Sequence, residues 1–158
     1  MASSGGRAGF FLICRVGAKL CALPLQNVLE TMRPLASEPL AHVAEFVAGL
    51  ALIRGRPTPV LDARKLLGSA ANDAPGRYIT LDLGAHGTRV AALAVDAVVG
   101  VRSVLDRELA ELPALLRTQE QIVGGVATLD AELLLVLEQS RIVSDELWER
   151  LQRGRAEP

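Results

Sequence analysis

Short apolar segments separated by turn residues recur along the whole chain, and this pattern is typical of a β-rich fold. The first segment, 10–16, is apolar on both faces until Arg15, as expected for a strand packed into a core. Gly17 begins a turn, and residues 20–23 return as the partner strand of a hairpin. Residues 28–33 form a further candidate strand.

A second hairpin is predicted where prolines and a glycine interrupt the apolar pattern. Its strands, 50–53 and 58–61, flank Gly55, which suits the positive φ of a tight turn. Pro57 and Pro59 have no N–H to donate to a ladder. The second strand is therefore predicted to lie at a sheet edge or to contain a bulge.

A short helix, a linker and a second run of strands are predicted beyond this hairpin. Asp62 can cap a helix over 63–67, and the small polar residues of 69–76 form the best linker candidate. A final helix over 144–151 has Ser144 as its cap. The later strands are expected at 78–83, 88–95, 98–104, 122–129 and 132–137.

A weak internal repeat relates the two halves of the chain. Residues 49–62 align with residues 125–138 at an offset of 76, and residues 22–28 align with residues 92–98 at an offset of 70. The alternative is chance similarity in a chain rich in Ala, Leu and Val. Short strands with frequent turns favour small barrels, so the repeat predicts two similar β-barrels.

We therefore expect a single all-β domain over 8–151, with short helices and two packed five-stranded barrels. Its two subdomains, intertwined or adjacent, would cover about 8–68 and 77–143, before the C-terminal helix. Residues 1–7 and 152–158 would be flexible tails. Two packed barrels leave a groove lined by aliphatic side chains, which suits a partner helix or loop.

Composition excludes several classes of function. The chain has 17 basic and 18 acidic residues and few aromatic ones, which argues against a basic, base-stacking surface for nucleic acid. The longest apolar runs, 47–53 and 133–137, are too short to cross a bilayer, and the N-terminus lacks the apolar core of a signal peptide. We expect a cytoplasmic protein without direct membrane insertion. Residues 1–68 are net basic and residues 69–158 net acidic, a layout that either orients a partner or arises by chance.

Few residues suggest catalysis or metal binding. Cys14 and Cys21 are too few for a disulfide framework, and we interpret them as small core or surface residues, although a bridge between them is conceivable. His42 and His86 are expected in exposed loops, and no zinc spacing, nucleophile elbow or phosphate loop is present. We expect no catalytic residue, no metal and no cofactor. An enzyme or small-ligand site built on these four residues is the alternative.

One local basic group contains Arg54, Arg56, Arg64 and Lys65. It lacks the aromatic neighbours of an RNA site. It is interpreted either as a solvated hairpin tip or as a protein-contact patch, because Arg is enriched at interfaces.

Residues 49–62 combine Gly49 with Ile53-Arg54-Gly55 and, three residues later, Pro59-Val60-Leu61-Asp62. This run resembles the signature of the CheW-like chemotaxis coupling proteins, which is a Gly, then Leu-Arg-Gly, three residues and Pro-Val-x-Asp-Leu. The chain departs from the family pattern at Leu52, Ala63 and Ala44, where the family has Asn, Leu and often Pro. Further segments resemble the family in the same order: 11–17, 28–30, 46–49, 80–84, 94–98 and 124–126.

The resemblance implies two packed five-stranded SH3-like barrels and a non-catalytic adaptor. Such an adaptor couples the cytoplasmic tip of a chemoreceptor, a helical hairpin docked between the barrels, to a CheA-like histidine kinase. The kinase's regulatory domain has the same fold and pairs barrel to barrel. A divergent CheW-like protein that binds only one of the two partners is the alternative.

Carried over by position, the receptor groove would include Val28, Glu30, Ile53 and Arg54, with an ion pair between Glu30 and Arg54. The repeat adds Val98 and Val99 from the second half of the chain. The resemblance does not assign kinase-contact residues.

Overall fold

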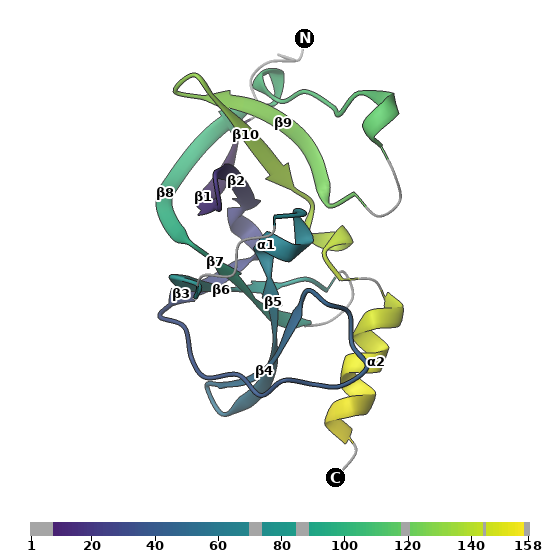
Figure 1. The fold of residues 1–158 in the computed structure, drawn as a ribbon. Helices are drawn as coiled ribbons and strands as arrows, with labels where there is room; N and C mark the ends of the chain where they lie inside the picture. The colour runs from purple at the N-terminus through teal and green to yellow at the C-terminus, as the bar shows by residue number, and fades with distance from the viewer. Residues whose placement is uncertain (1–7, 70–73, 85–88, 118–120, 144, 157–158) are drawn as a thin grey trace.

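The computed structural model describes residues 8–69, 74–84, 89–117, 121–143 and 145–156 (Figure 1). This part of the chain consists mainly of short strands, as predicted. The strands are β1 (Ala8–Val16), β2 (Lys19–Pro24), β3 (Val28–Met32), β4 (Val47–Ile53), β5 (Arg56–Asp62), β6 (Arg77–Asp82), β7 (Val90–Val95), β8 (Ala97–Leu105), β9 (Val123–Leu129) and β10 (Glu132–Leu137). The helical elements are η1 (Leu25–Asn27), α1 (Ala63–Leu66), η2 (Asp106–Glu108), η3 (Ala114–Leu116), η4 (Gln139–Arg141) and α2 (Asp145–Ala156).

The strands form two five-stranded sheets. The first sheet has the order β8-β1-β2-β10-β9, and the second has the order β3-β6-β7-β5-β4. In Figure 1 the first sheet fills the upper half of the molecule and the second sheet the lower half. The end strands of each sheet share no ladder in the described part of the chain, so each sheet is SH3-like without being a barrel closed by hydrogen bonds.

The predicted division of the chain into 8–68 and 77–143 is wrong, because each sheet takes strands from both halves. Strands β1 and β2 join β8, β9 and β10, while β6 and β7 join β3, β4 and β5. The chain crosses from the first sheet to the second after β2 and returns after β7. The repeat identifies equivalent strands, but it does not say which copy of a strand pairs with which. The intertwined arrangement is therefore the one that the fold adopts.

The pairing of strands follows the sequence repeat. Ala22 of β2 lies beside Val136 of β10 in a parallel pair. Ala92 of β7 lies beside Val60 of β5 in the equivalent parallel pair. The two alanines are related by the offset of 70 and the two valines by the offset of 76. Both parallel pairs join strands from different halves of the sequence, so they tie the halves together.

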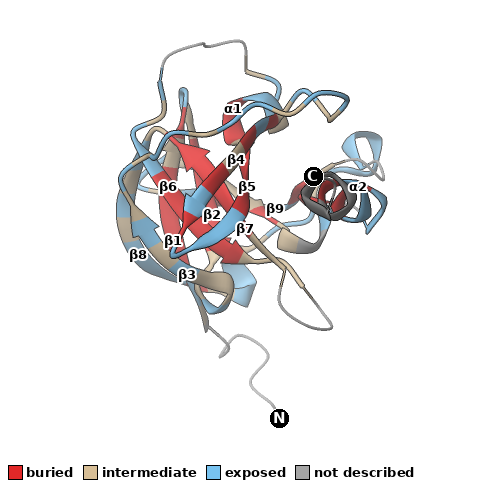
Figure 2. Cartoon of the chain, turned by 90° about the horizontal axis from the view of Figure 1, so that it is seen from below, coloured by how far each residue is buried: buried red, intermediate tan, exposed pale blue. Residues whose placement is uncertain are grey.

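The central strands are apolar on both faces because each face contacts a different core. Cys21 and Leu23 of β2 belong to a large core between the sheets, which also contains Leu93 and Leu137. The alternate residues of β2 face a second core within the first sheet. A third core lies within the second sheet. Figure 2 shows the buried positions gathered on the inner strands.

Several local predictions are confirmed and others need correction. The Asp62 carboxylate caps α1 by accepting a hydrogen bond from the Arg64 backbone N–H at 3.0 Å, as predicted. Helix α2 continues to Ala156, so the tail predicted from residue 152 is helical over its first turn. Strand β5 is not an edge strand, because it pairs with both β4 and β7. Its pairing with β7 begins only at Val60, so Pro57 and Pro59 lie opposite β4 alone. The predictions for 1–7, 70–73, His86 and Ser144 lie outside the described residues.

Asp96, between β7 and β8, connects the two sheets. Its carboxylate accepts a hydrogen bond from the backbone N–H of Gly17 in the β1–β2 turn. It also pairs with the guanidinium of Arg64 on α1, whose Nε lies 3.1 Å from Asp96 Oδ2. Arg64 is buried, so this ion pair holds a charge that has little access to water.

Removal of Asp96 should destabilise the whole domain. In Asp96→Ala the buried Arg64 guanidinium loses its carboxylate, which should lower the free energy of unfolding by about 3 kcal/mol. Urea denaturation followed by far-UV circular dichroism measures this difference. Asp106→Ala, at an exposed position on η2, is the control and should change stability by less than about 0.5 kcal/mol. Equal effects of the two substitutions would contradict the connecting role of Asp96.

The two hairpin turns adopt the same strained backbone with different residues. The β4–β5 turn has Arg54 at φ 51° and Gly55 at φ 76°, and the β9–β10 turn has Asp130 at φ 50° and Ala131 at φ 65°. Two successive positive φ values define the turn that suits a two-residue hairpin. Glycine adopts this conformation freely, whereas alanine is strained in it.

Exchanging Gly and Ala between these turns should therefore change stability in opposite directions. Ala131→Gly should raise the free energy of unfolding by about 0.5–1 kcal/mol, and Gly55→Ala should lower it by a similar amount. Thermal or urea unfolding of the two variants gives the comparison. Changes of the same sign would show that factors other than backbone strain dominate.

Candidate functional site

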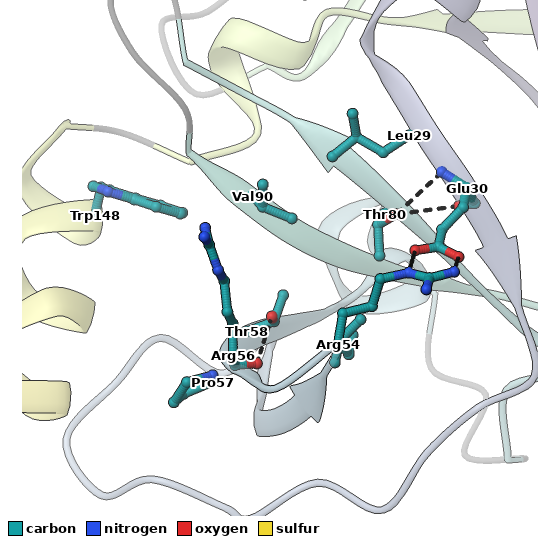
Figure 3. Close-up of a pocket in the computed structure, with 10 residues that line it drawn as sticks. Leu29, Glu30, Arg54, Arg56, Pro57, Thr58, Thr80, Val90 and Trp148 are labelled. Atoms are coloured by element: carbon teal, nitrogen blue, oxygen red, sulfur yellow. Dashed lines mark hydrogen bonds and ion pairs between the residues drawn. The ribbon is translucent and has the colours of Figure 1, made fainter.

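A pocket of about 330 Å³ lies at one end of the second sheet. It is bounded by β3, by the β4–β5 hairpin and by α2, as Figure 3 shows. Segments far apart in the sequence therefore form a single concave surface. The lining residues are Leu29, Glu30, Ile53, Arg54, Arg56, Pro57, Thr58, Thr80, Val90 and Trp148.

Glu30 and Arg54 form a two-point ion pair at the rim of this pocket. Arg54 Nε lies 2.7 Å from Glu30 Oε2, and Arg54 Nη2 lies 2.8 Å from Glu30 Oε1. The Arg54 side chain is 77% exposed and the Glu30 side chain 29% exposed. An exposed pair contributes little to stability, typically about 0–1 kcal/mol, so its accessible charges are better suited to recognition than to holding the fold.

A bulge in β3 sets the position of Glu30. The β3–β6 register is interrupted between Val28 and Glu30, which leaves Leu29 without a partner in the ladder. Buried Thr80 restores the connection, because its Oγ1 accepts a hydrogen bond from the Glu30 N–H at 3.1 Å and lies 3.3 Å from the Glu30 carbonyl oxygen. The bulge thus places Glu30 at the rim beside an apolar side chain, Leu29, that is 54% exposed.

The ion pair also changes the protonation equilibria of its two members. The hydrogen bonds from Arg54 lower the pKa of the Glu30 carboxyl below its ordinary value, more than partial desolvation raises it. The hydrogen bonds to Glu30 raise the pKa of Arg54. Both shifts favour the charged pair.

Helix α2 supplies the far wall of the pocket through Trp148. This side chain is only 4% exposed, and it packs into the core between the sheets with Leu147 and Leu151. The Arg89 guanidinium carbon lies 5.9 Å from the centre of the ring, and the same guanidinium pairs with Asp145 on α2. Among the described residues, the indole Nε1 has no hydrogen-bond partner. Apolar packing and the contacts of Arg89 therefore hold the wall.

A comparison with known families identifies the domain. The sequence model of the CheW-like domain family matches residues 11–147. The chain belongs to the CheW-like domain family. Membership of this family agrees with the expectation of a non-catalytic chain.

Individual relatives agree with this assignment. The CheW-like chain is 34% identical to protein FrzA of Myxococcus xanthus over 94 residues, which are 60% of this chain and 58% of FrzA. It is 25% identical to chemotaxis protein CheW of Rhizobium meliloti over 145 residues, 91% of this chain and 92% of the relative. The crystal structure of scaffolding protein TtCheW from Thermoanaerobacter tengcongensis has the same fold, with a TM-score of 0.73 at 22% identity, over 84% of this chain and 90% of TtCheW.

The structure brings together three of the six predicted groove residues of this CheW-like domain. Glu30, Ile53 and Arg54 line the pocket, and the predicted Glu30–Arg54 ion pair is present. Val28 lies just before the bulge and packs against the core between the sheets. Val98 and Val99 do not line the pocket, because β8 pairs with β1 in the first sheet.

Sequence reasoning missed the residues that reach the pocket from other elements. Thr80 and Val90 come from β6 and β7, and Trp148 comes from the last helix. Their positions depend on strand exchange and on the docking of α2, neither of which leaves a local pattern. Arg56 was predicted only as part of the local basic group. Its closeness in sequence to the predicted groove residues Ile53 and Arg54 was the one signal that could have placed it in the pocket.

Cys14 and Cys21 are core residues of the CheW-like fold. They lie opposite each other in the β1–β2 register, and both are free and buried. Burial raises the pKa of both thiols, that of Cys21 to about 11, which keeps them protonated at neutral pH. His42 is exposed on a loop. In the described ranges no three His, Cys, Asp or Glu side chains are grouped to hold a metal ion, and no helix is long and apolar enough to cross a membrane.

The pKa of Glu30 provides a direct test of the ion pair. In Arg54→Met the hydrogen bonds that lower this pKa are lost, so the titration midpoint of the Glu30 carboxyl should rise. NMR titration of the side-chain carboxyl carbon measures the midpoint. Because the pKa of Glu30 is depressed, the pair is fully formed at pH values above the ordinary pKa of Glu. It is lost as the pH falls through the lower midpoint of Glu30.

Arg15→Met is the matched control for this titration. Arg15 pairs with Glu132 at 2.8 and 2.9 Å in the first sheet and lowers the pKa of that carboxyl in the same way. The substitution should raise the midpoint of Glu132 and leave Glu30 unchanged. An unchanged Glu30 midpoint in Arg54→Met would show that the pair does not form in solution.

Proposed function

We propose that this chain is a cytoplasmic adaptor that couples chemoreceptors to a CheA-like histidine kinase in a chemosensory array. The observation that carries the proposal is an accessible, two-point ion pair at the rim of a pocket in a CheW-like domain. Relatives named as chemotaxis protein CheW and a crystal structure described as a scaffolding protein support it.

The receptor tip would dock at the pocket of the second sheet. Glu30 and Arg54 offer both signs of charge in a fixed geometry, and the exposed Leu29 offers an apolar surface beside them. Such a surface suits a helix that presents polar and apolar side chains on one face. Because the ion pair contributes little to stability, its main effect would be on the choice of partner.

Further receptor contacts would come from residues near the crossing points of the chain. Val28 begins β3, after the first crossing, and Val98 and Val99 lie near the start of β8, after the second. Val99 is exposed and lies at a break in the β1–β8 register, as Leu29 does in β3. The kinase would bind elsewhere, through its own domain of the same fold, at residues that remain unassigned.

A protein that binds only one of the two partners is the second candidate. Leu52, which stands where the family has Asn, is 68% exposed on the edge strand β4. A partner at that edge would meet an apolar side chain in place of an amide. Ala63, by contrast, is buried and alters only packing. Separate pull-downs with purified receptor fragment and purified kinase distinguish this candidate from the full adaptor.

Disrupting the ion pair should weaken receptor binding without unfolding the domain. In Arg54→Ala the half-buried carboxylate of Glu30 loses its partner, and we expect at least about tenfold weaker co-sedimentation with receptor-containing membranes. The double variant Glu30→Arg with Arg54→Glu, which reverses the pair, should recover part of the loss. Circular dichroism verifies that each variant is folded.

The matched control removes a two-point ion pair of the first sheet. Arg15→Ala breaks a two-point ion pair of similar geometry with Glu132, far from the pocket in sequence and in another sheet. It should leave receptor binding unchanged. Equal losses from Arg15→Ala and Arg54→Ala, or no loss from either, would contradict the proposed docking site.

A further inference from the structure

The pocket carries an unbalanced positive charge. Glu30 is the one acidic residue among its lining residues, and Arg54 already neutralises it. Arg56 also lines the pocket, is exposed, and forms no ion pair within the described residues. In Figure 3 the Arg54 guanidinium faces Glu30, whereas the Arg56 side chain extends the other way, toward Trp148 and Val90. The pocket therefore has a charge-balanced side and a cationic side.

The cationic side has apolar surroundings. Val90, Pro57 and the buried ring of Trp148 line the pocket with Arg56. On the helix that carries Trp148, Asp145 pairs with Arg89. A carboxylate that entered here would displace water and meet a guanidinium in a less polar environment than bulk solvent, which strengthens the attraction.

We propose that the docking segment of the receptor places an Asp or Glu side chain against Arg56, on the Trp148 side of the pocket. This inference rests on the proposed function and adds a second contact point to it, separate from the Glu30–Arg54 pair. Charge complementarity favours this occupant, because the pocket has one guanidinium in excess and an arginine fork binds a carboxylate at two points.

The repeat explains why only one end of the molecule would accept this residue. Glu132 occupies the position related to Arg56 by the offset of 76, at the start of β10. Its charge is opposite, and it is paired with Arg15. The turn before it contains Asp130, where the second sheet has Arg54. An acidic partner residue would thus be attracted to the hairpin of the second sheet and repelled by that of the first.

Charge reversal at Arg56 tests this inference. The probe is a purified chemoreceptor tip fragment encoded in the same genome as this chain, and binding is measured by calorimetry. Arg56→Glu should weaken binding by about tenfold or more, and Arg56→Met by about fivefold. Each Asp and Glu of the fragment is then changed in turn to Lys. One of these changes should restore binding to the Arg56→Glu variant while weakening binding to the unmodified chain.

Trp148 provides a second readout, because it is the single tryptophan of the chain. Its fluorescence should change when the fragment binds to the unmodified chain, since the partner would lie against the wall that the ring forms. Arg107 lies on η2, directly after β8. The variant Arg107→Glu is the control for non-specific charge effects and should bind the fragment normally.

The outcomes separate this inference from the proposed function. Failure of the unmodified chain to bind the fragment would overturn both. Binding that Arg54→Ala abolishes and Arg56→Glu leaves unchanged would overturn only the acidic contact. Equal losses from Arg56→Glu and Arg107→Glu, or the absence of any restoring Lys variant, would also overturn it.

Discussion

The exchange of strands between the two halves of the chain is the constraint on which the rest of this structure depends. Each sheet is completed by a parallel pair, β2 with β10 and β7 with β5, whose members come from opposite halves. Neither half contains a complete sheet. The central strands consequently face apolar surroundings on both sides, and the shared core between the sheets contains side chains from nearly every part of the chain. Asp96 and Arg64 reinforce this arrangement at the point where the chain returns to the first sheet.

The candidate site follows from the same arrangement. The edge strands β3 and β4 of the second sheet approach each other through the Glu30–Arg54 pair, and the bulge at Leu29 leaves an apolar side chain exposed beside it. Helix α2, which follows the last strand of the first sheet, then covers one side of the second. The pocket is therefore built by both halves, although its charged residues come from a short stretch of the first.

Local patterns in the sequence were enough to predict most strands, the β4–β5 hairpin and the capped helix α1. These features depend on alternation, turn residues and caps, which are properties of neighbouring residues. The Glu30–Arg54 pair was predicted through a family resemblance. The division into sheets was not predictable in this way. The repeat produces two strands with nearly the same pattern, and either of them could pair with a given neighbouring strand. Trp148 was missed for a related reason: its spacing with Leu147 and Leu151 indicates an apolar helix face but not the surface that this face covers.

The interleaved order of the strands also bears on how the chain is made. Ala8 of β1 pairs with Leu105 of β8, so the first strand of this domain must wait for a partner that is synthesised much later. Contacts between residues this distant in sequence form slowly. During synthesis the first hairpin has an unpaired edge on each side, where β8 and β10 will later lie, and such edges readily pair with other chains. The newly made chain is thus most vulnerable to aggregation before its last hairpin emerges.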